Sequence, residues 1–307
     1  MSDFIIEENK YNILTWKCDN ILTKYEGSDE IVYVPDGVNI VKGAFQNNST
    51  VRRIILPDSV TAIDCHAFQG CTNLEEIVFS DNIEIIRPYA FNGCAALKEL
   101  LLPKALKKLE ASFRGLNSLE VIKFPEAITE IDLGGCPSLK RIIASNKAKS
   151  LVLNECDSIE EIILPEGVET LTVYNCKSFK SVKYSKKLRD CSFKNCDSLK
   201  ELILPEGVSQ IGVENCGSLE HIYIPKSVTF LGSDIFKGVK SGLNITYGGS
   251  LTDWQKLISD RETYDGNGPT LNQYHYLGEL AWIAYGPDIK TERVIDTEFK
   301  YNLKCEI

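Results

Sequence analysis

Cysteine and histidine are the residue types in this chain that could do chemistry, and their spacing indicates which kind. The chain has 307 residues, with eleven cysteines and three histidines. The histidines fall in separate regions, at His66, His221 and His275, and so indicate no shared site. Five cysteines instead recur every 20 residues, at Cys136, Cys156, Cys176, Cys196 and Cys216.

No catalytic motif accompanies these residues. The sequence contains no P-loop, no G-x-S-x-G, no H-E-x-x-H and no C-x-x-C. An enzyme would need clustered titratable groups in a pocket, and the sequence shows no such cluster. We therefore predict a non-enzymatic protein with no catalytic residue, no cofactor and no metal ion.

A regular interval runs through most of the chain and sets the spacing of the cysteines. Ten positions, most of them directly before a proline, mark successive copies: Val34, Leu56, Phe79, Leu102, Phe124, Ala144, Leu164, Tyr184, Leu204 and Ile224. The first four intervals are 22 or 23 residues and the last five are 20. Each copy reads roughly L-x-x-I-x-L-P-x-x-V-x-x-I, so the chain is a repeat protein.

One copy cannot bury its own apolar face, whereas stacked copies share a continuous core. In the copy LKELILP, strand alternation points Leu202 and Leu204 inward and Glu201 and Ile203 outward. The segment 168–173 is predicted to form a second short strand of its coil. The sequence therefore predicts a right-handed solenoid, predominantly parallel β, with short helical or 3₁₀ turns only in the 22–23-residue coils.

These elements place the recurring cysteines at an inward corner between the second strand of one coil and the first strand of the next. Free cysteine is among the most buried residue types, so we expect a column of buried thiols. Disulfides or a metal site remain alternatives, but stacked parallel side chains suit neither geometry. Cys71 and Cys94 hold the same corner position, and Cys191 fills an inward second-strand slot. The state of Cys18, Cys65 and Cys305, which lie outside this column, is left open.

The segments Leu56–Phe79 and Ile224–Gly238 resemble the BspA-like (Treponema pallidum type) leucine-rich repeat family. Ile21–Val38 is similar to the usual start of its arrays, and Ile245–Leu257 to the tail that often closes them. The resemblance implies a leucine-rich-repeat solenoid that binds a partner. Relatives are often surface or secreted proteins of bacteria and protists implicated in adhesion or host contact.

Three parts are expected along the chain. Residues 1–30 form an N-terminal β cap, residues 31–245 form an array of about ten 20–23-residue coils, and residues 246–307 form a C-terminal cap helix and tail. Within 250–259, Ser250 or Thr252 could begin the helix, with Trp254, Leu257 and Ile258 on one face. The stretch 274–286 could add a strand or a helix to the last coil, or act as a contact element. The aromatic residues that can seal the first coil are Tyr11, Trp16 and Tyr25.

Counting along the first strands gives two outward columns on what we expect to be the concave face. One column holds the first outward residue of each strand, and the other holds the residue two positions later. This second column is mostly aliphatic, and exposed apolar patches often mark partner sites. Alternatively, β-branched residues are there because they suit strands. The predicted partner-binding residues are Ile55, Val78, Leu101, Ile143, Ile163, Ile203, His221, Tyr223, Glu161 and Glu201.

We predict a protein-interaction or adhesion-type scaffold that binds a protein, or a glycan, through the concave face as a monomer. The alternative is a structural or self-assembling module that uses its C-terminal tail as the contact element. A net charge of −9 argues against nucleic acid, and no apolar run approaches the length that spans a bilayer. The first residues lack the pattern of a signal peptide, and many thiols fit the cytosol, whereas the resemblance implies export.

Overall fold

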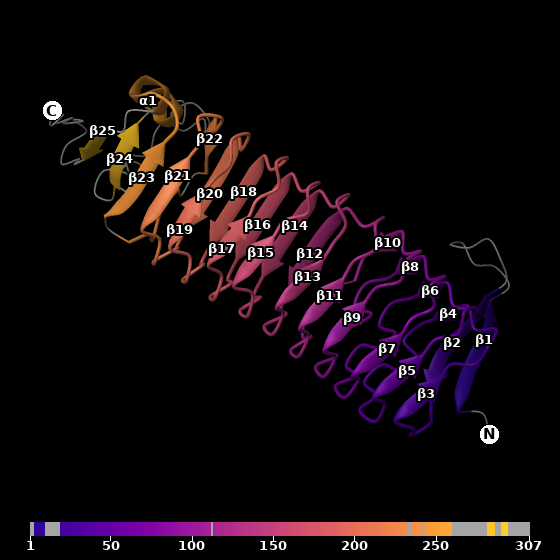
Figure 1. Ribbon diagram of the computed structural model, residues 1–307. Helices are drawn as coiled ribbons and strands as arrows, with labels where there is room; N and C mark the ends of the chain where they lie inside the picture. The colour runs from indigo at the N-terminus through magenta and orange to yellow at the C-terminus, as the bar shows by residue number, and fades with distance from the viewer. Residues whose placement is uncertain are drawn as a thin grey trace, which may run out of the picture. The chain divides into compact units, whose positions relative to one another are not determined.

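The computed structural model describes residues 3–9, 19–111, 113–232, 235–240, 242–259, 281–285 and 290–293. The chain divides into two compact units, residues 1–159 and 160–307. Within each unit, successive coils stack so that like strands pair in parallel, which makes each a parallel-β solenoid (Figure 1). The predicted fold class is confirmed.

The first strand of each coil in residues 1–159 is three residues long, and these strands form two sheets. One sheet contains β3 (Ile31–Tyr33), β5 (Arg53–Ile55) and β7 (Glu76–Val78). The other contains β9 (Glu99–Leu101), β11 (Val121–Lys123) and β13 (Arg141–Ile143). Pairing is in register, with Ile54 opposite Ile77 and Ile122 opposite Ile142, so like positions form files across the coils.

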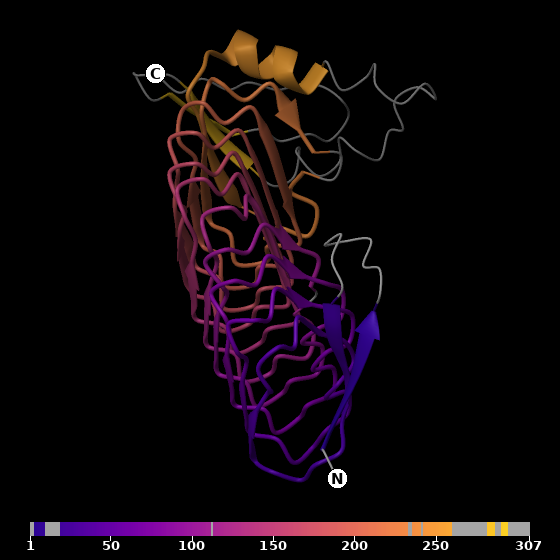
Figure 2. The same cartoon turned by 90° about the vertical axis from the view of Figure 1, so that its right-hand side faces the viewer.

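The second strands of the same unit form another layer, which Figure 2 shows across the coil from the first strands. Two strands begin it: β1 (Phe4–Asn9) runs antiparallel to β2 (Asp19–Tyr25). The sheet continues through β4 (Ile40–Val41), β6 (Ala62–Ile63), β8 (Ile85–Ile86) and β10 (Lys108–Leu109). The strands β12 (Glu130–Gly134) and β14 (Ser150–Asn154) pair with each other. Tyr25 is buried against Phe45 at the first coil, whereas Tyr11 and Trp16 lie outside the described residues.

Residues 160–307 repeat the arrangement. Among the first strands, β15 (Glu161–Ile163) pairs with β17 (Ser181–Lys183), and a separate sheet contains β19 (Glu201–Ile203), β21 (His221–Ile224) and β23 (Leu243–Tyr247). This sheet continues through β24 (Ala281–Tyr285) and ends with β25 (Lys290–Arg293), which runs antiparallel to β24. The second strands are β16 (Thr170–Tyr174), β18 (Asp190–Lys194), β20 (Gln210–Glu214) and β22 (Phe230–Leu231). Of the alternatives for 274–286, the described part adopts the extra strand, because β24 pairs with β23.

One helix, α1 (Leu251–Ser259), follows the last complete coil. Ser250 begins it: its hydroxyl accepts the backbone N–H of Asp253 at 3.2 Å, and its own N–H donates to the Asp253 carboxylate at 3.0 Å. Trp254 and Leu257 are buried, and the Trp254 ring lies 5.2 Å from the ring of Tyr247. The side chain of Ile258 lies outside the described residues.

Coil length decides how the chain reaches the corner before the next first strand. In the 22–23-residue coils the second strand has two residues and is followed by i→i+3 turns, such as Cys71 N–H to the Phe68 carbonyl. The phenylalanines of these turns stack in the core, with neighbouring ring centroids 5.8 to 6.5 Å apart. In the 20-residue coils a five-residue second strand leads to the corner directly.

The predicted cysteine column is buried as expected. Each corner cysteine has no exposed surface, and the described cysteines are free thiols. The residue before each one has a positive φ, for example 73° at Gly70 and 56° at Asn175, which explains the recurring Gly-Cys and Asn-Cys pairs. Glu155 holds this conformation at φ 55° without the freedom of glycine. Cys191 is also buried, opposite Leu171.

Hydrogen bonding gives a reason for cysteine at the corner instead of alanine. The thiol of Cys71 donates to the carbonyl of Phe45 in the preceding coil at 2.9 Å, and that of Cys94 donates to Phe68 at 3.1 Å. Burial raises the pKa of Cys71 to about 12. A buried, protonated thiol is a poor nucleophile and a poor metal ligand, so Cys71 belongs to the core.

Candidate functional site

The outward columns of the first strands have the register predicted by counting. In residues 1–159, Ile55 lies opposite Val78, and Leu101 lies opposite Lys123. Leu101 is 50% exposed, whereas Ile55, Val78 and Ile143 are half-buried. The structure therefore places these four predicted apolar residues on one face of the unit's first strands, and Leu101 is the most exposed of them.

The predicted residues of 160–307 form a similar row on that unit. Ile163 lies opposite Lys183 and is 68% exposed, and Ile203 lies opposite Tyr223 and is 47% exposed. Tyr223 is half-buried.

Charged and polar side chains run beside this row on the same strands. The Lys183 amine lies 3.1 Å from the Glu161 carboxylate. His221 is held by two contacts, because its Nδ1 lies 3.1 Å from the Glu201 carboxylate and its Nε2 lies 3.1 Å from the Thr246 hydroxyl. Of the other histidines, His66 stacks on Tyr89 in the first unit, and His275 lies outside the described residues.

Sequence counting missed the first coil of the row. On β3, Tyr33 is 69% exposed and lies opposite Ile55, and Ile31 is 50% exposed. Val34 already marks this coil, so counting back one and three residues from it identifies Tyr33 and Ile31. The apolar row therefore begins one coil earlier than predicted.

A row of charges, also missed, lies one residue before the first strands of most coils. In residues 1–159 its sign alternates along Glu30, Arg52, Glu75, Lys98, Glu120 and Lys140. The Arg52 guanidinium lies 2.6 Å from the Glu75 carboxylate, and the Lys140 amine lies 3.0 Å from Glu120. Exposed pairs of this kind contribute about 1 kcal/mol or less, so they align neighbouring coils more than they stabilise them.

The first-strand layer is interrupted between β7 and β9. The ladder bonds are present before and after this point: Leu56 N–H donates to Val78 and Leu102 N–H donates to Lys123, both at 3.0 Å. Within the described residues 75–102, no such bond joins β7 to β9, which belong to different sheets. Behind them β8 and β10 remain paired, so only the first-strand layer opens.

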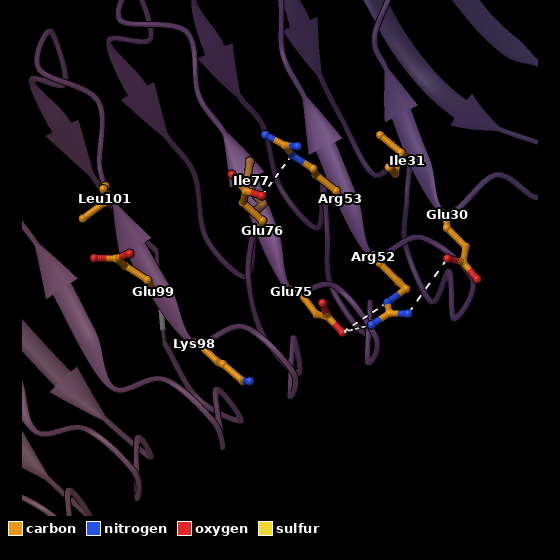
Figure 3. A pocket seen from close by; sticks show the side chains of 10 residues that line it. All are labelled: Glu30, Ile31, Arg52, Arg53, Glu75, Glu76, Ile77, Lys98, Glu99 and Leu101. Carbon is orange, nitrogen blue, oxygen red and sulfur yellow. Dashed lines mark hydrogen bonds and ion pairs between the residues drawn. The ribbon is translucent and has the colours of Figure 1, made fainter.

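A pocket of about 580 Å³ lies over the first strands from β3 to β9 and includes this interruption (Figure 3). Ile77, the middle residue of β7, is partly exposed there, whereas its neighbour Ile54 on β5 is fully buried. The lining residues are Glu30, Ile31, Arg52, Arg53, Glu75, Glu76, Ile77, Lys98, Glu99 and Leu101.

The coil of β7 lacks the proline that follows the first strand in most coils. Phe79 is followed by Ser80 instead, and the same replacement occurs at Tyr184-Ser185, where β17 and β19 are unpaired. Proline holds the residue before it extended, which keeps that residue's N–H directed into the ladder. Serine imposes no such restriction, and the buried Ser80 hydroxyl instead accepts the N–H of Asn82 at 3.1 Å.

Among the residues that the structure describes, no helix combines the length and the apolar composition that a membrane span requires. No group of three or more histidine, cysteine, aspartate or glutamate side chains in the same residues could hold a metal ion.

Comparison with known proteins adds to these observations. A comparison with curated sequences found no match. A leucine-rich repeat protein from Bacteroides ovatus has a similar solved structure, with a TM-score of 0.64 and 23% identity over 81% of this chain and 70% of that one. The leucine-rich repeat protein of T. pallidum matches with 26% identity over 62% of this chain and 83% of that one, at a TM-score of 0.43.

The family comparison covers most of the repeat array. The model of the BspA type leucine-rich repeat region matches residues 38–154 and 134–244, with six copies. These residues include the corner cysteines and most of the first strands described above. The chain therefore belongs to the BspA-type leucine-rich repeat family.

Proposed function

We propose that this protein is a non-enzymatic scaffold that binds a protein partner through the outward face of its first strands. The observation that carries the proposal is the row of exposed apolar side chains on that face, above all Leu101 in one unit and Ile163 and Ile203 in the other. Leaving such side chains in water forgoes the free energy of burying them, about 25 cal/mol per Å², which a partner would recover.

The surroundings of the row support a polypeptide partner. Carboxylates, amines and one histidine lie beside the apolar side chains on the same or the neighbouring strand. Glu201, for example, lies two residues before Ile203, and His221 lies opposite Glu201 on β21. An apolar centre with a polar rim is the usual anatomy of a protein interface. Each unit carries its own part of the row, and the proposal applies to each separately.

The test begins with a partner captured from the source organism's extract, identified, and then purified. Its dissociation constant is measured against the wild-type chain and against Leu101→Lys and Ile203→Lys, one variant in each unit. We expect at least tenfold weaker binding for the variant whose unit is contacted, since truncating or charging an interface anchor commonly costs more than 1.4 kcal/mol. Asp132→Lys and Thr172→Lys, on the second strands β12 and β16, are the matched controls and should bind as wild type does.

Other outcomes separate the alternatives. If only the second-strand variants weaken binding, the proposed face is wrong. Sedimentation of the chain alone tests the monomer that we propose: a mass that rises with concentration would favour a self-assembling module. A captured oligosaccharide that survives protease treatment would replace the protein partner with a glycan.

A further inference from the structure

We infer that the opening between β7 and β9 receives an arginine side chain of the partner. This inference rests on the proposed function and adds a specific recognition element to it. Three observations on that opening carry it: an interrupted strand ladder, a partly exposed core isoleucine, and a lining with one more carboxylate than cationic side chain.

The interruption gives the opening its shape. Because β7 and β9 do not pair with each other, their facing edges leave backbone groups that the ladder does not use. Ile77 lines the opening from β7, and Leu101 lines it from β9 (Figure 3). These two side chains provide an apolar surface for the aliphatic part of a long side chain. The pocket of about 580 Å³ extends from this opening over β5 to β3, so the opening is one part of it.

The charges on the strands select a cation. Arg53 and Glu76 neutralise each other, with Nε and Oε2 2.9 Å apart. Within the described residues neither Glu99 nor its neighbour Lys98 forms an ion pair, and Arg52 already pairs with Glu75. The lining as a whole holds four carboxylates (Glu30, Glu75, Glu76 and Glu99) and three cationic side chains (Arg52, Arg53 and Lys98). The lining is therefore net negative by one charge.

The geometry favours arginine over lysine. A guanidinium is flat and can enter between two strands, and its five N–H donors match a carboxylate in a bidentate pair. The donors left over can bond to the Glu76 carboxylate on the other side of the opening or to the unused backbone carbonyls. An ammonium group is more strongly hydrated and has three donors, so it would leave more of these acceptors unpaired.

The experiment titrates the full-length protein into a fluorescein-labelled, C-terminally amidated peptide, Gly-Leu-Arg-Leu-Gly, and follows anisotropy. We expect saturable binding that falls at least tenfold when citrulline, which has the shape of arginine without its charge, replaces it. Glu99→Gln should weaken binding of the arginine peptide by a similar factor. Glu130→Gln, an exposed carboxylate on the second strand β12 of the same unit, is the matched control and should change nothing.

Each contrary result overturns the inference in a recognisable way. Equal affinity for the arginine and citrulline peptides would show that no cation is selected. Unchanged binding to Glu99→Gln would place the peptide elsewhere, and no binding at about 1 mM peptide would remove the site. A lysine peptide that binds more tightly would contradict the choice of arginine. None of these results affects the partner titrations with Leu101→Lys and Ile203→Lys, so those titrations test the proposed function separately.

Discussion

The buried thiols predict that the first unit loses stability at alkaline pH. Cys71 and Cys136 are fully buried, and burial raises the pKa of each from 9.0 to about 12. Between these values the unfolded chain releases the thiol protons while the folded chain keeps them. The stabilisation is therefore complete below pH 9 and is lost as the pH rises toward 12.

The size of the effect follows from the two pKa values. At pH 10, one unit above the unfolded value, each thiol lowers the free energy of unfolding by about 1 to 2 kcal/mol. Cys71 and Cys136 together lower it by about 3 kcal/mol. The double variant Cys71→Ala/Cys136→Ala removes this dependence. The variant is less stable at pH 7, because it loses the thiol bonds to Phe45 and Phe113, but that loss does not depend on pH.

The assay is urea unfolding followed by circular dichroism at pH 7 and pH 10, with a phosphine reductant present throughout. Wild type should lose about 3 kcal/mol more than the double variant over this interval, since tyrosines and the other thiols contribute equally to both. Equal losses in the two proteins would refute the reasoning, because they would mean that Cys71 and Cys136 ionise alike in the folded and unfolded states.

Three smaller predictions test other parts of the fold. Glu155→Asn should raise the free energy of unfolding by about 0.5 to 1 kcal/mol in a urea titration, because asparagine tolerates the positive φ there; a decrease would count against that explanation. Ser80→Pro should stabilise by about 0.5 to 1 kcal/mol. It should also slow hydrogen exchange at Phe79 by pairing β7 with β9. Exchange as fast as in wild type would show that the serine does not cause the interruption. Ser250→Ala should speed exchange in the first turn of α1, at a cost of about 1 kcal/mol, if the capping contact with Asp253 is what begins the helix.

Much of the fold could be predicted because each coil repeats the same constraint. A strand alternates its side chains, so a fixed interval fixes which residues point inward: Leu202 and Leu204 are buried and Ile203 is exposed. The corner cysteines followed from the same count. Their thiol bonds to carbonyls of the preceding coil could not be predicted, because they depend on backbone positions that the repeat pattern does not specify.

The candidate site could be predicted only in part. Counting located Leu101, Ile163 and Ile203, but it began too late to include Tyr33. Because Phe79 keeps the apolar type of its position in the repeat, hydrophobic patterning carries no information on the interruption between β7 and β9. The replacement of the usual proline by Ser80 was its one signal in the sequence, and that signal acquires a meaning only once the strand pairing is known.

Hydrogen exchange of the full chain with and without the purified partner tests the binding face most directly. The account predicts slower exchange in the first strands of at least one unit, such as β9 and β11 or β19 and β21, and unchanged exchange in the second strands β12, β14, β16 and β18. Protection confined to those second strands, with the first strands unaffected, would contradict it.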